Sequence, residues 1–165
     1  MLAALLRNRA FLEPWEPARP ESDFTLEGQM AAMHSLVGGR AAGTTYGFGI
    51  RVGDAGELAG GITLSQVFRK NFQSCYLGYW VGEAHNGRGV GSEAVRLVVA
   101  QAFEVLELHR IQANVMPKNS RSARILEKAG FRKEGRALRY LRIAGQWEDH
   151  DMFAITSEDV ARPES

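Results

Sequence analysis

The chain has 165 residues, of which 45% are hydrophobic and 24% charged, and 20 Lys and Arg against 19 Asp and Glu leave a formal net charge of +1. This composition is typical of a globular domain and excludes a disordered chain. The near-zero charge provides no broad field for nucleic acid or a membrane surface, so neither is expected as a partner. We therefore expect a single domain over 1–165.

The cysteine content and the first residues bear on the compartment. The single cysteine, Cys75, cannot form an intramolecular disulfide or a thiolate metal cluster, so a reducing compartment is expected. The apolar stretch over 1–6 is too short to span a membrane. A cytoplasmic protein is the resulting expectation.

Two helices are predicted before the first strand. A helix over 2–9 is expected to end before the proline-rich segment 14–20, because each proline removes a backbone donor and restrains its neighbour. Apolar residues at helical spacing predict a second helix over 26–37, with a stop at Gly38-Gly39.

From residue 45 the apolar period changes to that of strands, and two paired strands are predicted around a turn over 53–56. Residues 74–81 are apolar on both parities, which predicts a central strand covered on both faces. Residues 91–106 carry the one-sided apolar stripe of a helix that packs on a sheet. Three further elements complete the order, namely a strand over 110–115, a helix from 119 or 120 to 129, and a hairpin of 139–143 and 147–155.

A glycine-rich loop over 83–92 joins the predicted central strand to the next helix. Its glycines allow positive φ angles and a close approach, so consecutive backbone N–H groups can point at one anion, and Arg88 adds a cation. Phosphate is the expected ligand. A P-loop is excluded because the loop holds no lysine, and a dinucleotide fingerprint fails because Ser92 or Ala94 stands where its last glycine is required.

The pattern that remains, xxxGxG over 86–91, resembles the acetyl-CoA pyrophosphate loop of the GNAT acetyltransferase superfamily. Further motifs look like its RimJ/RimL branch, which acetylates protein N-termini, notably those of ribosomal proteins. These motifs are Gly-Tyr-Trp-Val at 78–81, Asn-Ser-Arg-Ser at 119–122, Lys-Ala-Gly-Phe at 128–131, Glu-Gly at 134–135, Gly-Gln-Trp-Glu-Asp at 145–149, Arg-Asn-Arg at 7–9 and Pro-Trp at 14–15. The resemblance covers roughly residues 8–154.

The resemblance implies an α/β GNAT fold, with a twisted mixed central β-sheet flanked by helices. The strand that usually precedes the first helix in this family is expected to be missing from this chain. An open sheet edge favours pairing between chains, so a homodimer is one expectation.

The resemblance also implies acetyl-CoA as the cofactor. Backbone groups of Trp80, Val81 and Gly82 would contact pantetheine and the thioester carbonyl, and the Asn119 amide would contact the pantetheine arm. The pyrophosphate would lie on the loop residues Asn86, Gly87, Arg88, Gly89, Val90, Gly91 and Ser92. The four histidines have no ligand spacing, so no metal site is expected. Tyr79, Trp80 and Trp147 are expected to be core or cleft-wall aromatics.

Amide formation from a thioester requires a neutral amine and a protonated leaving thiolate. The resemblance implies Glu83 as the general base, although a loop carboxylate can also be merely solvated. It implies Ser122 as the general acid, although a hydroxyl at a helix start can also bond locally to the backbone. The tyrosine that many other members use is replaced by Leu126. Asp149 could attract a substrate ammonium or be a hairpin surface charge.

Taken together, these implications predict an N-acetyltransferase that transfers acetyl directly from acetyl-CoA to a primary amine. The preferred acceptor is the N-terminal α-amine of a protein, such as a ribosomal protein. Two alternatives stay open: acetylation of a small amine, such as an aminoglycoside or polyamine, and a catalytically weak acyl-CoA-binding module.

Overall fold

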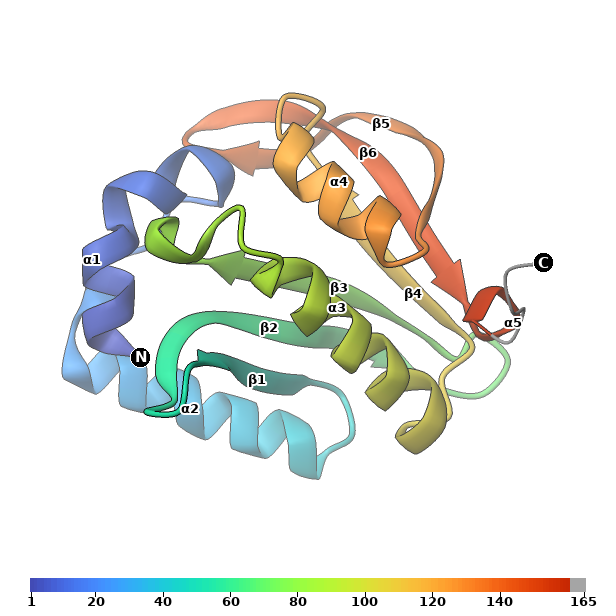
Figure 1. Cartoon of the computed structure of the whole chain (residues 1–165), viewed down its shortest axis with the longest axis horizontal. Coiled ribbons are helices and arrows are strands. Elements are labelled where there is room, and N and C mark those ends of the chain that lie inside the picture. The colour runs from blue at the N-terminus through green and yellow to red at the C-terminus, as the bar shows by residue number, and fades with distance from the viewer. Residues whose placement is uncertain (161–165) are drawn as a thin grey trace.

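The structure, a computed structural model, describes residues 1–160, and its strands form one six-stranded sheet in the order β1-β2-β3-β4-β6-β5 (Figure 1). The strands are β1 (Tyr46–Val52), β2 (Glu57–Phe68), β3 (Ser74–Val81), β4 (Arg110–Val115), β5 (Arg132–Ile143) and β6 (Gln146–Thr156). The longer helices are α1 (Leu2–Leu12), α2 (Leu26–Ala41), α3 (Val90–Ala100) and α4 (Ser120–Lys128). The shorter ones are η1 (Glu13–Trp15), η2 (Glu21–Phe24), η3 (Glu83–His85), η4 (Gln101–Val105) and α5 (Ser157–Val160).

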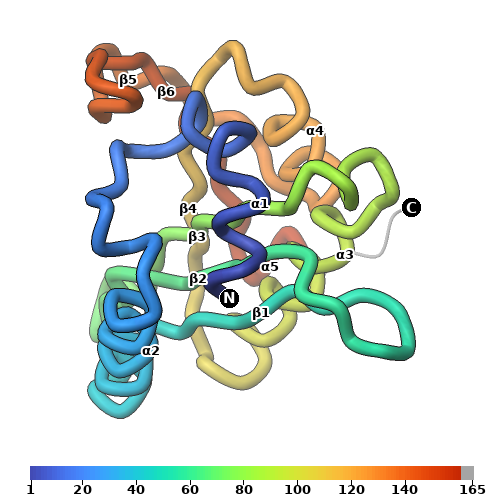
Figure 2. The backbone as a smooth tube through the Cα atoms, turned by 90° about the vertical axis from the view of Figure 1, so that its left-hand side faces the viewer, coloured from blue at the N-terminus to red at the C-terminus, as the bar shows by residue number. Residues whose placement is uncertain are grey.

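The helices lie on both faces of the sheet. Helices α3 and α4 lie on one face and α2 on the other, while α1 lies across one end (Figure 2). All neighbouring strands are antiparallel except β3 and β4, which are parallel. The core contains fully buried side chains from β2, α3, β4, α4 and β6, among them Leu64, Val95, Ile111, Leu126 and Phe153. Removal of this apolar surface from water is the main favourable contribution to folding.

Most of the predicted elements are confirmed. The segment over 74–81 is an internal strand, β4 has the predicted bounds, and α4 begins after Asn119 and is followed by Gly130 at φ 89°. The β5–β6 turn at Ala144-Gly145 has positive φ at both residues, as a tight hairpin requires. Cys75 is fully buried in β3, and burial raises the pKa of its thiol to about 12.

The predicted stop at Gly38-Gly39 is wrong, because α2 continues to Ala41 and the chain turns at Gly43, with φ 70°. A Cβ on Gly39 would stand 2.9 Å from the Cβ of Thr45. Gly39 therefore lets the chain around Thr45 pack closely against the helix. It does not form a left-handed cap. The predicted helix over 91–106 is also divided, because α3 gives way to the π-turn η4, in which the N–H of Leu106 donates to the carbonyl of Gln101.

The apolar residues that predicted α2 lie largely on its exposed side. Leu26, Met30 and Val37 are more than half exposed, whereas Gln29 is buried and its amide donates to the carbonyl of Asp23 at 2.7 Å. The apolar residues of α2 therefore do not decide which of its faces packs against the rest of the protein. Trp147, which sequence reasoning placed in the core or a cleft wall, is 64% exposed, so that prediction is wrong.

Strand β1 lies at one edge of the sheet, and within residues 1–160 no strand pairs with its outer side. The first element of the described residues is α1. Within residues 1–160 no helix has the length and apolar content required to cross a membrane.

Candidate active site

The two parallel strands in the middle of the sheet separate. Strands β3 and β4 pair only where Ser74, Cys75 and Tyr76 face Arg110, Ile111 and Gln112, although β3 continues to Val81 and β4 to Val115. Beyond this point their facing edges lack the backbone partners that a continuous sheet would supply. The separation opens into a cleft of about 1070 Å³, lined by both strand ends, the start of α4 and the segment after α1.

The glycine loop lies at the carboxyl end of β3. Gly87 and Gly89 have φ angles of 75° and 82°, and Gly89 is the residue immediately before α3. The first N–H groups of a helix have no partner within it and attract anions, so the start of α3 suits a phosphate. A Cβ on Gly91 would stand 2.8 Å from the Ile125 side chain, so this glycine lets α3 approach α4 closely.

The Asn86 side chain connects this loop to the end of β3 by hydrogen bonds. Its Nδ2 donates to the carbonyl of Val81 at 3.2 Å and to that of Gly82 at 2.9 Å. The N–H of Gly82 donates to Ala59 of β2 at 2.7 Å. Because successive strand residues direct their backbone groups to opposite edges, the N–H of Val81 faces the cleft. The backbone groups of Trp80 face β2, while its side chain lines the cleft.

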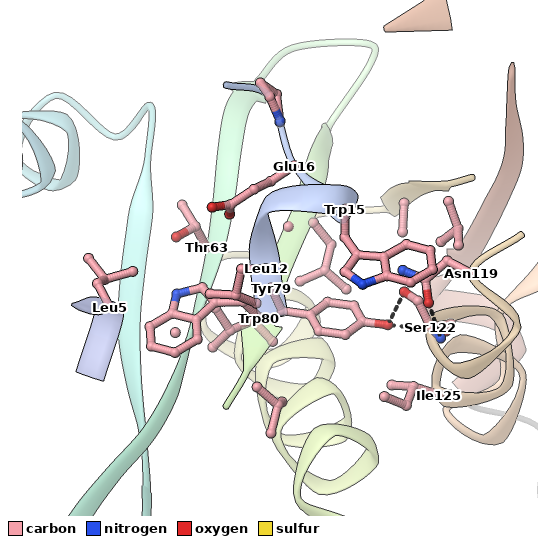
Figure 3. A pocket seen from close by; sticks show the side chains of 18 of the residues that line it. Leu5, Leu12, Trp15, Glu16, Thr63, Tyr79, Trp80, Asn119, Ser122 and Ile125 are labelled. Carbon is pink, nitrogen blue, oxygen red and sulfur yellow. Dashed lines mark hydrogen bonds between the residues drawn. The ribbon is translucent and has the colours of Figure 1, made fainter. Parts of the chain in front are cut away.

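Ser122 and Tyr79 meet inside the cleft (Figure 3). The Tyr79 hydroxyl lies 2.8 Å from Ser122 Oγ and 3.1 Å from the Ser122 carbonyl oxygen. Asn119 Oδ1 accepts the Ser122 N–H at 3.2 Å, which caps α4 and holds the serine at its first turn. Burial raises the pKa of Tyr79 to about 12, so its hydroxyl keeps its proton at neutral pH.

The contact between Tyr79 and Ser122 was missed by sequence reasoning. The sequence predicts Tyr79 only as a core or cleft-wall aromatic, because the two residues lie 43 positions apart and meet only when β3 packs beside α4. No local spacing in the sequence signals such a pair.

The remaining predicted residues do not all lie in the cleft. Glu83 lies on η3, is exposed, is absent from the cleft lining and has its N–H bound to Asn8 Oδ1 at 2.8 Å. Its role as general base stays a prediction. Asn86, Asn119 and Ser122 line the cleft, whereas Arg88, Gly89, Val90 and Ser92 line a hollow between α3 and β1.

Among residues 1–160, Glu16 is the one carboxylate that lines the cleft. It follows η1, lies between Pro14 and Pro17, and binds Arg19 through both oxygens, with Nε and Nη2 at 2.5 and 2.8 Å. The sequence marks this segment only as proline-rich, and its one signal of function is a charged residue between prolines. Asp149 instead accepts the N–H of Arg139 at 2.8 Å, so it stabilises the β5–β6 hairpin.

Comparison with known proteins agrees with this geometry. Residues 1–132 match the family model described as acetyltransferase (GNAT) domain. The chain is 43% identical to a probable N-acetyltransferase, YjcK, of Bacillus subtilis over 92% of its own length and 84% of that protein. It is 40% identical to the [ribosomal protein uS5]-alanine N-acetyltransferase of Escherichia coli, over 92% of this chain and 78% of that one.

A solved structure extends the comparison to the fold. Mycobacterium smegmatis RimJ in complex with CoA-disulfide superposes with a TM-score of 0.91 at 30% identity, covering 98% of this chain and 78% of that chain. The chain therefore shares its overall fold with this solved structure. The chain belongs to the GNAT acetyltransferase family and is an N-acetyltransferase.

Proposed function

We propose that this protein transfers acetyl from acetyl-CoA directly to the N-terminal α-amine of a protein, with a ribosomal protein as the preferred acceptor. The observation that carries the proposal is the 40% identity to a ribosomal-protein N-acetyltransferase over 152 residues, 92% of this chain. The aligned length is 92% of this chain, so the similarity is not confined to the segment of the glycine loop.

The residues at the carboxyl end of β3 fit acetyl-CoA. The free N–H groups at the start of α3 and the positive φ angles of Gly87 and Gly89 suit the pyrophosphate. The N–H of Val81, which faces the cleft where β4 has moved away, suits the pantetheine arm or the thioester carbonyl. Acetyl-CoA supplies an acetyl thioester whose carbonyl carbon is attacked by an amine.

The hydroxyl pair suits the proton that the leaving sulfur needs. When the Tyr79 O–H donates to Ser122 Oγ, the Ser122 proton is free to be given to a neighbouring sulfur. Tyr79 then positions and polarises the serine, which is the catalytic acid of the proposal. Removal of the ammonium proton is assigned to Glu83, through water, because its exposed side chain lies outside the cleft.

The charge of the cleft favours an acceptor with one ammonium group over a polyamine or an aminoglycoside. Within residues 1–160 the cleft lining holds one carboxylate, Glu16, against four cationic side chains, which are Arg19, Arg51, Lys118 and Arg121. A polycation would meet net repulsion there, whereas a peptide N-terminus brings a single positive charge.

Two finer expectations belong to the same proposal. A reducing, cytoplasmic compartment suits the buried free thiol of Cys75. The outer edge of β1 is unpaired within residues 1–160, and edge-to-edge pairing of two copies would supply its missing partners. Sedimentation equilibrium tests the homodimer, and a single monomeric species over the micromolar range would exclude it.

The acceptor is tested with ribosomes from cells that lack the protein. Intact-mass analysis of their ribosomal proteins should show one or more chains lighter by a single acetyl group, and reintroducing the wild-type gene should restore the mass. A catalytically impaired Ser122→Ala variant serves as the control. Unchanged masses in the deletion strain would contradict a ribosomal acceptor.

A further inference from the structure

We infer that Glu16 is the residue that binds the acceptor's N-terminal ammonium, a role that rests on the proposed function and specifies how the acceptor is recognised. Glu16 is the carboxylate of the cleft lining within residues 1–160, and the same cleft contains the Tyr79–Ser122 pair. In Figure 3 the Glu16 carboxylate points into the cleft, towards Thr63.

The carboxylate is held in place before any ligand arrives. Arg19 binds both of its oxygens, and the side chains of Glu16 and Arg19 are only 22% and 28% exposed. The bidentate pair fixes the plane of the carboxylate and uses two of about four acceptor positions. The remaining positions can accept hydrogen bonds from an amine.

The charges around Glu16 leave one negative charge without a partner. Arg19 also approaches Asp23, with Nη1 4.0 Å from Oδ2, so two carboxylates share one guanidinium. The three side chains carry a net charge of −1 when all are ionised. An incoming ammonium on the cleft side of Glu16 would neutralise this group, while Asp23 is not among the cleft-lining residues.

The backbone supports the same role. Glu16 has an extended conformation, with φ −132° and ψ 160°, at the end of η1, and Pro14 and Pro17 stand on either side of it. Proline fixes φ and limits its neighbour, so little conformational freedom is left to lose when a ligand binds. Trp15 and Leu12 line the cleft beside it and offer apolar contact for the first side chain of a peptide.

The test measures binding to the enzyme loaded with CoA, so it does not depend on turnover. The probes are an Ala-initiated hexapeptide and its counterpart in which a lactyl group replaces alanyl, which keeps the shape but replaces the ammonium by a hydroxyl. Wild-type protein should bind the amine about 10- to 100-fold more tightly than the hydroxyl analogue, as expected of a partly shielded charge-assisted contact. Glu16→Gln should remove this preference while CoA affinity and thermal unfolding stay unchanged.

Glu21→Gln is the matched control, because Glu21 lies in the same segment, pairs with Arg9 and does not line the cleft. It should keep the wild-type preference. If Glu16→Gln does not fold, Glu16→Asp, which keeps the charge but withdraws it, should reduce the preference several-fold. A Glu16 variant that discriminates as well as wild type, or a wild type that does not discriminate, would overturn the inference.

Acetyl-CoA turnover with the same amine peptide separates this result from the proposed function. If the preference for the amine depends on Glu16 but no turnover occurs, the proposed reaction is contradicted and the role of Glu16 is supported. Turnover with an unchanged preference in Glu16→Gln would support the reaction and overturn the role.

Discussion

The proposed cofactor side and the proposed acceptor side of the site are built from different chemical groups. On the cofactor side, the end of β3 and the start of α3 present backbone N–H groups, positioned by glycines at positive φ. On the acceptor side, the segment after α1 presents side chains, above all Glu16 held by Arg19. Backbone groups recognise a ligand common to a whole family, whereas side chains can change from one member to another without loss of the fold.

The largest expected effect lies where the two sides meet. Ser122→Ala removes the proposed proton donor, and kcat should fall about 100-fold, the lower end for general acid catalysis, because a thiolate is a good leaving group. The KM values of both substrates should stay within a few-fold. Steady-state kinetics with a peptide acceptor checks this, with Ser120→Ala, at the same helix start, as the control. A kcat within two-fold of wild type would remove Ser122 from the mechanism.

Tyr79→Phe removes only the partner of that serine, so kcat should fall about 10-fold, the effect of a lost buried hydrogen bond. The variant also has a pH signature in the free energy of unfolding. Burial raises the pKa of the folded Tyr79 to about 12, while the unfolded tyrosine ionises near 10, so folding favours the protonated form.

This stabilisation is fully present below pH 10 and is lost as pH rises towards 12. By pH 11 wild type should have lost about 1.4 kcal/mol more than Tyr79→Phe, relative to pH 8. Urea unfolding at the two pH values measures the difference. Parallel pH dependence of both proteins would contradict the burial of a neutral Tyr79.

A backbone change should affect the cofactor side alone. Gly89→Ala places a Cβ at φ 82°, which costs on the order of 1–2 kcal/mol, and acetyl-CoA affinity should fall about 10-fold as the start of α3 shifts. The KM of the peptide should stay unchanged. Calorimetric titration with CoA checks the affinity, and Gly135→Ala, where a Cβ has open space and φ is not positive, is the control. Equal losses of affinity for acetyl-CoA and for the peptide would contradict the assignment of the two substrates to separate sides.

The smallest effect is expected for a side chain on the cofactor side. Arg88 is exposed in the loop, so Arg88→Ala should weaken CoA binding only about two- to three-fold at physiological salt, and less at high salt. The same titration at two salt concentrations measures it. A loss larger than that of Gly89→Ala would show that side chains, not backbone groups, dominate this half of the site.

The sequence predicts the features that depend on local spacing. The spacing of the glycines predicts the loop before α3. The sequence predicts that Asn119 or Ser120 begins the next helix, and Asn119 caps it by accepting the N–H of Ser122. The internal position of β3 followed from apolar residues on both of its faces. Each of these signals lies within a few residues of the element that it predicts.

The features that sequence reasoning missed depend on contacts between distant segments. Tyr79 meets Ser122 across 43 residues, and Glu16 lines the cleft because α1 lies across one end of the sheet (Figure 2). The orientation of α2 depends on the bond from Gln29 to the carbonyl of Asp23, not on its apolar stripe. Tertiary packing, which no local pattern encodes, decides all three.

The most direct test of the account is acetyl-CoA turnover by the purified protein with peptides that begin with Ala, Ser or Thr, measured as thiol release beside a panel containing spermidine and an aminoglycoside. We expect turnover that is selective for the peptides, with mass spectrometry locating one acetyl group on the α-amine. Selective turnover of the small amines, or CoA binding without thiol release in either panel, would contradict it.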